Sequence, residues 1–414
     1  MKVCVLGVGY IGLPTAGILA NNGFNVVGVD VNKKYLNKLI NREFITNEKD
    51  LIELINKNLD SNNLHFSNEA VKADVFIICT PTPLKDDKSA DLSHLLSALN
   101  SILDLIEKDN LIIIESTIPL GTTNNIVKPL LEGQGLKVGD DIFLAYCPER
   151  VMPNNIVYEL ISNSRVIGGS TKKCQDKAKS FYQSFVKGEI ITENVDIVEL
   201  IKLIENSYRD INIAFANELA LLCSKLNLDV YKVIELANKH PRVNILKPGI
   251  GVGGHCLPVD SYFISTNHSD YTKIITLSRK INDNMPKIIT EKVVEILNCY
   301  DNPVVALWGL AYKGNSNDIR NSPSMEIFNY LRNENIEVRI FDPVVYNHDL
   351  NFGIETLKDA NLLMILVNHK EFAELDYNKY TSLMKTKIIY DGVNLIDKRT
   401  LDDGIKIIKL FKED

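Results

Sequence analysis

The stretch Lys2-Val3-Cys4-Val5-Leu6-Gly7-Val8-Gly9-Tyr10-Ile11-Gly12 decides the fold of the first part of this 414-residue chain. Its apolar first half predicts a buried strand, and its second half is a G-x-G-x-x-G pattern placed where a helix would begin. Gly7 permits a tight turn, Gly9 lets the backbone approach a pyrophosphate, and Gly12 lets the helix pack closely on the strand. The N–H groups and dipole of a helix N-terminus favour an anion. The stretch therefore predicts a dinucleotide-binding unit, the alternative being a glycine-rich turn without cofactor.

Asp30 supports the first interpretation. It follows a second apolar run, residues 25–29, and lies about 18 residues after Gly12, where an acid binds the ribose 2′-OH of a dinucleotide. A carboxylate there repels a 2′-phosphate, so we expect NAD as the cofactor and not NADP. Two loops, residues 80–83 and 116–119, also follow predicted strands, the third and fourth. Each has the Pro and Thr of ordinary turns, but together they favour cofactor contact.

The pattern of apolar runs predicts an α/β fold with two doubly wound, Rossmann-like domains. Further strands are expected at residues 74–79, 111–115 and 142–146, with helices between them, as in a parallel sheet covered on both faces. The last part of the chain returns to this pattern, with strands expected at residues 304–307, 337–341, 362–367 and 387–390.

The middle of the chain is helical. Residues 194–226 contain no Pro or Gly and predict a helix of about 30 residues, which suits a spine between domains or a dimerisation surface. Helices are also expected at residues 229–239 and 269–298. We therefore predict three domains: an NAD-binding domain (1–190), a central helical domain (191–298) and a C-terminal Rossmann-like domain (299–414).

The composition is that of a globular protein, with 45% hydrophobic and 24% charged residues. The net charge of −7 argues against a nucleic-acid or membrane-surface partner. Seven cysteines without a C-x-x-C pair indicate neither a disulfide framework nor a zinc site, and the histidines show no metal-ligand spacing, so no metal is expected. The chain opens on a strand-like run, not a signal peptide, and has no apolar run of roughly 20 residues, so we expect a cytoplasmic protein.

Cys256 ends the segment G-I-G-V-G-G-H-C at residues 249–256. The four glycines allow the backbone to wrap closely around a ligand. A thiol at the end of such a loop, with Asp260 four residues on, is a candidate nucleophile, although most free cysteines are inert core residues.

The long helix carries Lys202, Asn206 and Arg209 on one face, where they could hold an oxyanion or a phosphate. Taken alone, a solvated helix face explains them better. Glu149 could be a general base or a loop-end salt bridge, and His240 a substrate ligand or a polar loop residue. Later in the chain, residues 312–314 and 318–323 place basic side chains near strand and helix ends, where they could meet a diphosphate or be surface charge.

At this point seven motifs, by their order and spacing, make the whole chain resemble the UDP-glucose/GDP-mannose dehydrogenase family. They are G-V-G-Y-I-G-L-P, P-T-P, E-S-T-I, C-P-E-R-V, K-L-I-E-N-S-Y-R-D, G-V-G-G-H-C and A-Y-K-G-N-S-N-D-I-R-N-S-P. The segments R-D-I-N-I-A-F-A-N-E-L and N-K-H-P-R-V-N resemble the branch of the family that acts on UDP-N-acetylmannosamine.

The resemblance implies a four-electron, NAD-dependent oxidation of a UDP-sugar at C6, through a thiohemiacetal and a thioester on a cysteine, for surface polysaccharide synthesis. It also implies a homodimer formed through the central helix, or a tetramer. The catalytic roles that it implies are nucleophile for Cys256, oxyanion stabilisation for Lys202 and Asn206, activation of the thiol or a water for Asp260, and base in thioester hydrolysis for Glu149.

The resemblance implies two further sets of residues. The expected NAD-binding residues are Gly7, Gly9, Tyr10, Ile11, Gly12, Asp30, Lys34, Thr82, Thr117 and Arg320. The expected substrate-binding residues are Arg150, Val151, Lys202, Asn206, Arg209, His240, Arg242, Asn244, Gly253, Tyr312 and Lys313, and in relatives the arginine that matches Arg242 serves the neighbouring subunit's site.

Two positions depart from the family pattern. Ser261 follows Asp260 where relatives often have proline, which we expect to alter only a turn. Val393 in D-G-V-N (391–394) stands where relatives have a lysine or arginine, so a basic substrate contact is missing unless another lysine replaces it. The alternatives are UDP-N-acetylglucosamine or UDP-glucose as substrate, a two-electron hydroxyacid dehydrogenase that needs no cysteine, and an NAD-sensing binding module.

Overall fold

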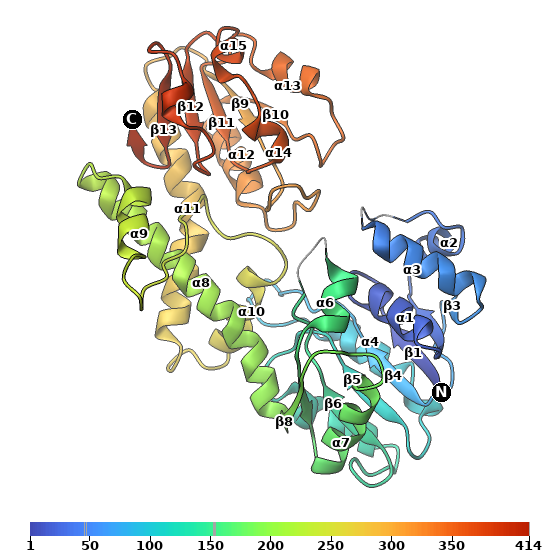
Figure 1. The fold of residues 1–414 in the computed structure, drawn as a ribbon. Helices are drawn as coiled ribbons and strands as arrows, with labels where there is room; N and C mark the ends of the chain where they lie inside the picture. The colour runs from blue at the N-terminus through green and yellow to red at the C-terminus, as the bar shows by residue number, and fades with distance from the viewer. Residues whose placement is uncertain (45, 47, 152–154, 414) are drawn as a thin grey trace. The chain divides into compact units, whose positions relative to one another are not determined.

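The computed structural model describes residues 1–44, 46, 48–151 and 155–413. The chain divides into two compact units, Met1–Glu205 and Asn206–Asp414, each built around one sheet (Figure 1). Within the described residues, no helix is both long and apolar enough to cross a membrane.

The first unit is a doubly wound α/β domain with an eight-stranded sheet in the order β3-β2-β1-β4-β5-β6-β7-β8. All pairs are parallel except β6 with β7. The strands are β1 (Lys2–Leu6), β2 (Asn25–Val29), β3 (Leu64–Ser67), β4 (Val75–Ile78), β5 (Leu111–Ile114), β6 (Phe143–Tyr146), β7 (Arg165–Gly169) and β8 (Ile190–Asn194). The helices are α1 (Gly12–Asn21), α2 (Lys33–Ile40), α3 (Lys49–Asp60), α4 (Ser93–Asn100), α5 (Lys128–Glu132), α6 (Ile156–Ser162) and α7 (Lys172–Tyr182).

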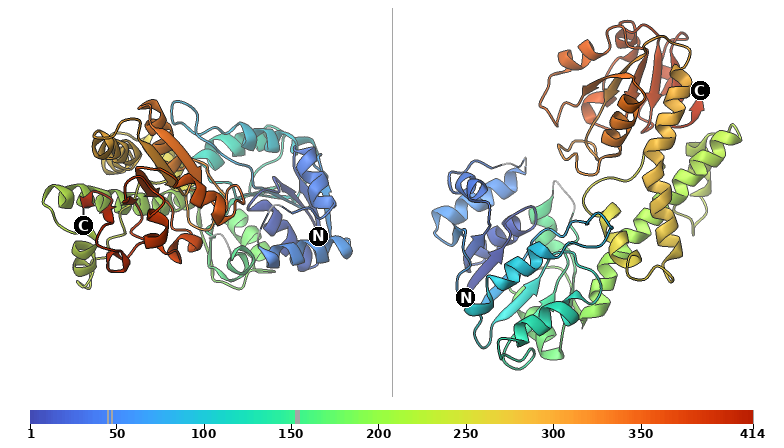
Figure 2. Two further views of the ribbon diagram at one scale, coloured as in Figure 1. Left: turned by 90° about the horizontal axis from the view of Figure 1, so that it is seen from above. Right: turned by 180° about the vertical axis from the view of Figure 1, so that it is seen from behind.

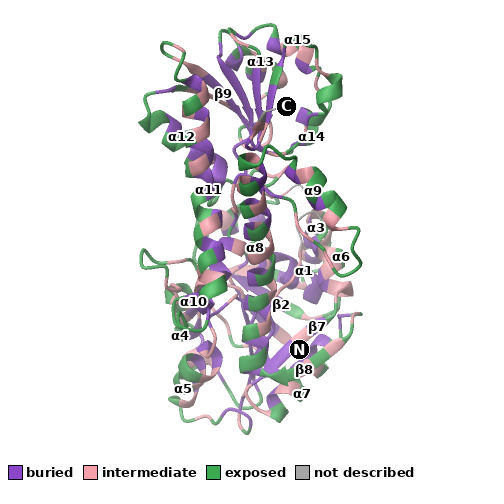
Figure 3. Cartoon of the chain, turned by 90° about the vertical axis from the view of Figure 1, so that its left-hand side faces the viewer, coloured by how far each residue is buried: buried purple, intermediate pink, exposed green. Residues whose placement is uncertain are grey.

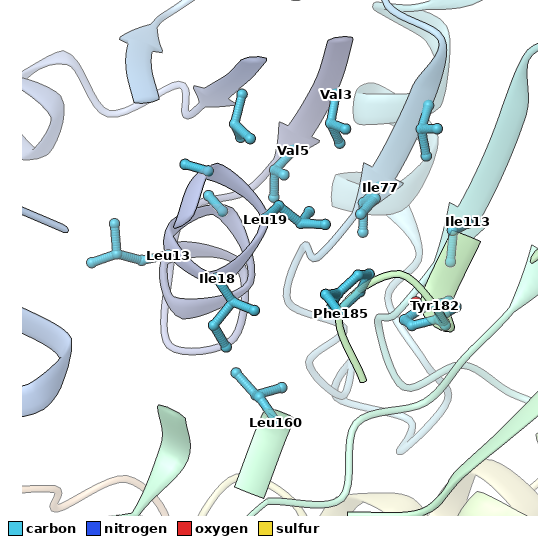
Figure 4. Close-up of a cluster of buried hydrophobic side chains, with 14 of the residues drawn as sticks. Val3, Val5, Leu13, Ile18, Leu19, Ile77, Ile113, Leu160, Tyr182 and Phe185 are labelled. Carbon is cyan, nitrogen blue, oxygen red and sulfur yellow. The ribbon is translucent and has the colours of Figure 1, made fainter. Parts of the chain in front are cut away.

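Helices cover both faces of this sheet, because its central strands are apolar on both sides. Alternate residues such as Val3, Val5 and Ile77 pack against α1 and α7 (Figure 4), and the residues between them, such as Cys4 and Phe76, pack against α4 and α5. Figure 2 shows the helices of the second face from behind. A continuous apolar run, and not an alternating one, is therefore what the central strands required.

The second unit combines long helices with a second Rossmann-like sheet of six strands, in the order β10-β9-β11-β12-β13-β14. Its strands are β9 (Val304–Trp308), β10 (Glu337–Phe341), β11 (Leu362–Ile365), β12 (Ile388–Asp391), β13 (Lys406–Lys409) and β14 (Lys412–Glu413), the last of which is antiparallel. Its helices are α9 (Val230–Ala237), α10 (Leu257–Ser265), α11 (Lys273–Leu297), α12 (Pro323–Asn333), α13 (Leu350–Thr356), α14 (Lys370–Ala373) and α15 (Tyr377–Thr381). The helix α8 (Val195–Lys225) begins in the first unit and continues into the second.

The predicted fold class is confirmed, and so is the long helix, which is 31 residues long. Sequence analysis did not predict β3, β7, β8, α10, β13 or β14. Because β3 adds a strand, the loops at residues 80–83 and 116–119 follow the fourth and fifth strands of the chain, not the third and fourth.

Candidate active site

The glycine loop after β1 leaves space for a ligand at one position only. Gly7 has φ +87°, and a Cβ atom there would lie 2.8 Å from the Cys79 carbonyl oxygen; at Gly12 it would lie 1.8 Å from the Gly7 oxygen. A Cβ atom at Gly9 would meet no atom within 4 Å. Gly7 and Gly12 are therefore required by packing, whereas the open space at Gly9 fits the pyrophosphate of a dinucleotide.

Asp30 lies at the carboxyl end of β2, where the ribose of NAD would need it. Its Oδ1 atom accepts the Asn32 N–H at 2.9 Å, and Asn32 in turn caps α2 by accepting the Tyr35 N–H. The Tyr35 hydroxyl donates to the Val8 carbonyl oxygen at 3.1 Å, which ties α2 to the glycine loop. The other expected NAD ligands here are the exposed Tyr10 and Lys34 and the half-buried Ile11.

The two threonine-containing loops meet at the carboxyl ends of β4 and β5. The Thr82 hydroxyl donates to the Thr117 carbonyl oxygen at 2.6 Å, and the Thr80 and Ser116 hydroxyls are 3.5 Å apart. The structure therefore brings Thr82 and Thr117 together, at the edge where ligands of open α/β sheets bind.

Sequence analysis missed a buried acid beside these loops. Glu115 is 4% exposed and accepts hydrogen bonds from the Tyr182 hydroxyl (2.6 Å), the Cys79 thiol and the Thr15 hydroxyl (both 3.3 Å). Burial raises the pKa of Glu115, although Arg165 opposes the shift. A glutamate directly after the apolar run of β5 was the feature that could have indicated it.

Glu149 forms a buried ion pair with Arg165, the first residue of β7. The backbone oxygen of Glu149 accepts a hydrogen bond from the Lys202 ammonium at 2.9 Å. Arg150 pairs with Glu205 at 2.8 Å, and Val151 packs against the core of the first unit. The salt bridge that sequence analysis considered for Glu149 is present, and its partner was missed because β7 was not recognised.

Cys256 stands at the N-cap position of α10 in the second unit and is partly exposed. A helix N-terminus favours a thiolate, the reactive form of cysteine. One turn into the helix, Asp260 is 2% exposed, and its Oδ2 atom accepts a hydrogen bond from the Asn206 amide at 2.6 Å. The structure thus brings Asn206 of α8 together with Asp260 of α10, the helix that Cys256 caps.

A buried polar network fixes α10 on its neighbours. Ser261 is fully buried, and its hydroxyl donates to Asp210 of α8 at 3.2 Å. Asp210 also receives Arg279 and Asn282 of α11, at 2.5 and 2.8 Å. Ser261 therefore lies in a helix and anchors it, whereas sequence analysis expected this position to affect only a turn.

The glycine loop before Cys256 packs against the segment that follows β9. A Cβ atom on Gly253 would lie 2.6 Å from the Asn321 oxygen, and one on Gly254 would lie 2.9 Å from the Tyr312 ring. Burial raises the pKa of Tyr312, and the charges of Asp318 and Cys256 raise it further. Arg320 donates to Asp318 at 2.9 Å and lies 3.2 Å from a His255 nitrogen. Tyr312 and Arg320 are thus neighbours of the candidate nucleophile.

The remaining predicted residues lie at the surface of the second unit. Arg209 on α8 is exposed, although Lys202 and Asn206 on the same helix are buried. Lys313 is exposed beside Tyr312. In the loop after α9, His240, Arg242 and Asn244 are all exposed.

Comparison with known protein families matches three parts of the chain to models of one family. Residues 1–186 match the NAD-binding domain of the UDP-glucose/GDP-mannose dehydrogenase family, residues 197–284 its central domain, and residues 306–398 its UDP-binding domain.

Individual relatives agree with this assignment. A UDP-N-acetyl-D-mannosamine dehydrogenase of Methanocaldococcus jannaschii is 43% identical, over 99% of this chain and 96% of the relative. The solved structure of the UDP-D-ManNAc dehydrogenase from Pyrococcus horikoshii has a TM-score of 0.94 at 39% identity and covers 100% of this chain and 99% of its own. The UDP-N-acetyl-mannosamine dehydrogenase of Staphylococcus aureus has a TM-score of 0.90 at 43% identity, with 99% and 98% covered. With its NAD-binding and UDP-binding domains, the chain belongs to the UDP-glucose/GDP-mannose dehydrogenase family and is an NAD-dependent UDP-sugar dehydrogenase.

Proposed function

We propose that this enzyme oxidises UDP-N-acetyl-D-mannosamine at C6 to the corresponding uronate, and that the product serves surface polysaccharide synthesis. The choice of sugar is supported by the relatives, because those at 40–43% identity over at least 92% of this chain carry that substrate in their names. The motif N-K-H-P-R-V-N (238–244) points to the same branch.

Oxidation of a primary alcohol to a carboxylate removes four electrons, that is, two hydrides. NAD held by the open glycine loop and Asp30 would supply the hydride acceptor, with one NAD molecule consumed in each of the two oxidations. After the first, C6 is an aldehyde carbon. The Cys256 thiolate adds to it, forming a C–S bond and a thiohemiacetal alkoxide. In the second oxidation, the hydrogen that remains on C6 leaves as a hydride. The resulting thioester is cleaved by water, which restores the thiol and releases the acid.

The other residues act on charge and protons in this scheme. Asn206 and Lys202, one turn apart on α8, donate to the alkoxide formed on C6. Asp260, held by the Asn206 amide, orients the cysteine or the attacking water. Glu149, which forms an ion pair with Arg165, accepts the proton of the water that cleaves the thioester. Tyr312, Lys313 and Arg209 bind the nucleotide sugar.

The observation that carries the proposal is Cys256 at the N-terminus of α10. Partial exposure leaves its thiol accessible, and the helix terminus favours the thiolate. A two-electron dehydrogenase or an NAD-sensing module would need no accessible nucleophile with a buried amide–carboxylate pair one turn away.

The enzyme acts as a homodimer through α8. Six apolar side chains on this helix are between 36% and 64% exposed and follow one another in steps of three, four or seven residues, which is one continuous stripe: Ile197, Leu200, Ile204, Tyr208, Phe215 and Leu222. Figure 3 shows exposed positions along the length of α8. A second copy of the same stripe would cover this surface, and Arg242 from the exposed loop after α9 would serve the partner's site.

The test is NADH production with UDP-N-acetylmannosamine, UDP-N-acetylglucosamine and UDP-glucose, using wild type, Cys256→Ala and, as a matched control, the exposed cysteine variant Cys299→Ala. We expect the highest kcat/KM with the first substrate, no uronate from Cys256→Ala, and wild-type turnover from Cys299→Ala. A higher kcat/KM with another sugar would identify that sugar as the substrate. Full turnover by Cys256→Ala would refute the covalent mechanism, and NAD binding without turnover would indicate a binding module.

A further inference from the structure

Lys409 is a cation at the carboxyl edge of the second sheet. It is the last residue of β13 and lies in register with Asp391, the last residue of the parallel strand β12. Its ammonium donates to the Asn394 side-chain oxygen at 2.7 Å. The side chain therefore leans from β13 toward β12 and holds its charge over the turn at residues 391–394.

This turn is a rigid platform without a basic side chain of its own. Asp391 is fully buried and accepts the backbone N–H groups of Val393, Leu395 and Ile396, at 3.3, 3.0 and 2.8 Å. Val393 is apolar and packs against the core on one face of the sheet. The turn itself therefore supplies no cation, and Lys409 on the neighbouring strand is a cation beside it.

The turn also adjoins the loop that leads to the nucleophile. A Cβ atom on Gly392 would lie 2.7 Å from the side chain of Ile250, which is buried in the glycine loop. Further along that loop, Gly253 packs against the Tyr312 segment. The ends of β9 and β12 and the glycine loop thus form one continuous wall at the edge where open α/β sheets bind ligands.

We propose that Lys409 binds the diphosphate of the nucleotide sugar; this rests on the proposed function. The match to the family's UDP-binding domain ends at residue 398, so Lys409 lies outside it. The antiparallel pairing of β13 with β14 sets Lys409 directly opposite Lys412. Two lysines therefore lie at the ends of the paired strands at this corner of the sheet.

The test is calorimetric titration of UDP and of uridine into wild type, Lys409→Gln and Lys406→Gln. Lys406 is the matched control, because it begins the strand that Lys409 ends and so lies at the opposite edge of the sheet. We expect the Kd of UDP to rise roughly tenfold in Lys409→Gln, since a hydrogen bond to a charged group is lost, with uridine binding unchanged. Lys406→Gln should bind both like wild type.

Two results of the titration would overturn the proposal, and they have different consequences for the proposed function. If wild type binds UDP and Lys409→Gln binds it equally well, Lys409 does not contact the diphosphate, while the proposed function stands. If wild type does not bind UDP, the proposed function fails and this inference fails with it. As a second measurement, the UDP affinity of Lys409→Gln should fall less steeply with added salt than that of wild type; equal slopes contradict the proposal.

Discussion

In the proposed mechanism, the reactivity of Cys256 comes from its position at the start of α10. The first turn of a helix presents N–H groups and a positive dipole end, both of which stabilise a thiolate. The sequence indicated the nucleophile through its glycine loop, but it did not predict α10, so the helix-terminal position of the thiol came only from the structure.

Replacement of Asn206 tests whether its amide stabilises the alkoxide formed on C6. Its amide donates to Asp260 at 2.6 Å, and both side chains are buried. We expect Asn206→Ala to lower kcat roughly 100-fold, because a donor to the alkoxide is lost, and to leave the Kd of UDP unchanged. The control is Glu218→Ala, an exposed position on the same helix. Wild-type kcat in Asn206→Ala would exclude the role.

The buried carboxylate of Asp342 allows the electrostatics of the second sheet to be tested. Burial raises the pKa of Asp342, but hydrogen bonds from His369 and from the N–H groups of Leu310 and Val345 outweigh it and lower the pKa to about 2. A folded-state pKa below the unfolded value means that the carboxylate stabilises the fold above about pH 4 and loses this effect as the pH falls toward 2.

For Asp342→Asn we therefore expect a free energy of unfolding lower than wild type by about 2 kcal/mol at pH 7, with a smaller difference at pH 3. Urea unfolding at pH 7, 4 and 3 measures it, with the exposed Asp301→Asn as control. A difference that stays the same at all three pH values would show that the ionised carboxylate contributes no pH-dependent stability.

Among the residues, the sequence could indicate types and spacing but not partners. Glu149 carried two interpretations, and its ion pair with Arg165 became visible only when β7 placed the arginine beside it. Lys409 could not be anticipated, because its relation to the turn after β12 depends on strand order and register.

In the element β1–loop–α1, Gly7 and Gly12 are required by packing, whereas Gly9 is the glycine expected to contact the ligand. Gly9→Ala adds a Cβ atom in open space, whereas Gly12→Ala places one 1.8 Å from the Gly7 oxygen. We expect Gly9→Ala to keep the wild-type Tm and to weaken NAD binding at least tenfold, and Gly12→Ala to lower the Tm. Thermal melts and NAD titration distinguish these results. Unchanged NAD affinity in Gly9→Ala would show that the pyrophosphate does not bind against Gly9.

A substitution in the apolar stripe of α8 tests whether the enzyme forms a dimer through this helix. We expect wild type to have twice the chain mass by light scattering and Phe215→Glu to have a single chain mass, because a buried, unpaired carboxylate in the interface is costly. Phe352→Glu is the matched control, since Phe352 is exposed to 46% and Phe215 to 48%. A monomeric wild type, or a dimeric Phe215→Glu, would place the subunit contact on another surface.

Strong apolar periodicity explains which elements the sequence could predict. The bounds of β1 and β2 agree with prediction, and α8 differs by one residue at each end, because each is long or strongly apolar. The bounds of β10 also agree, although it is an edge strand with two charged residues. In contrast, β3 and β8 are edge strands with exposed residues, and β14 has only two residues. Elements of this kind are set by pairing with neighbours and not by local pattern.

Across the whole molecule, two Rossmann-like sheets place their candidate ligand-binding residues at the carboxyl ends of their strands, each within its own unit. The fold class followed from the apolar runs, because they alternate with helical stretches in both halves of the chain. The division into three domains stays a prediction beside the two compact units of the structure.

The four-electron oxidation is tested most directly by stoichiometry: NADH formed and UDP-N-acetylmannosamine consumed, both counted at completion of a single reaction. The proposed mechanism predicts two NADH for each sugar oxidised, with the uronate as the product. One NADH for each sugar, with an aldehyde or ketone as the product, would contradict it.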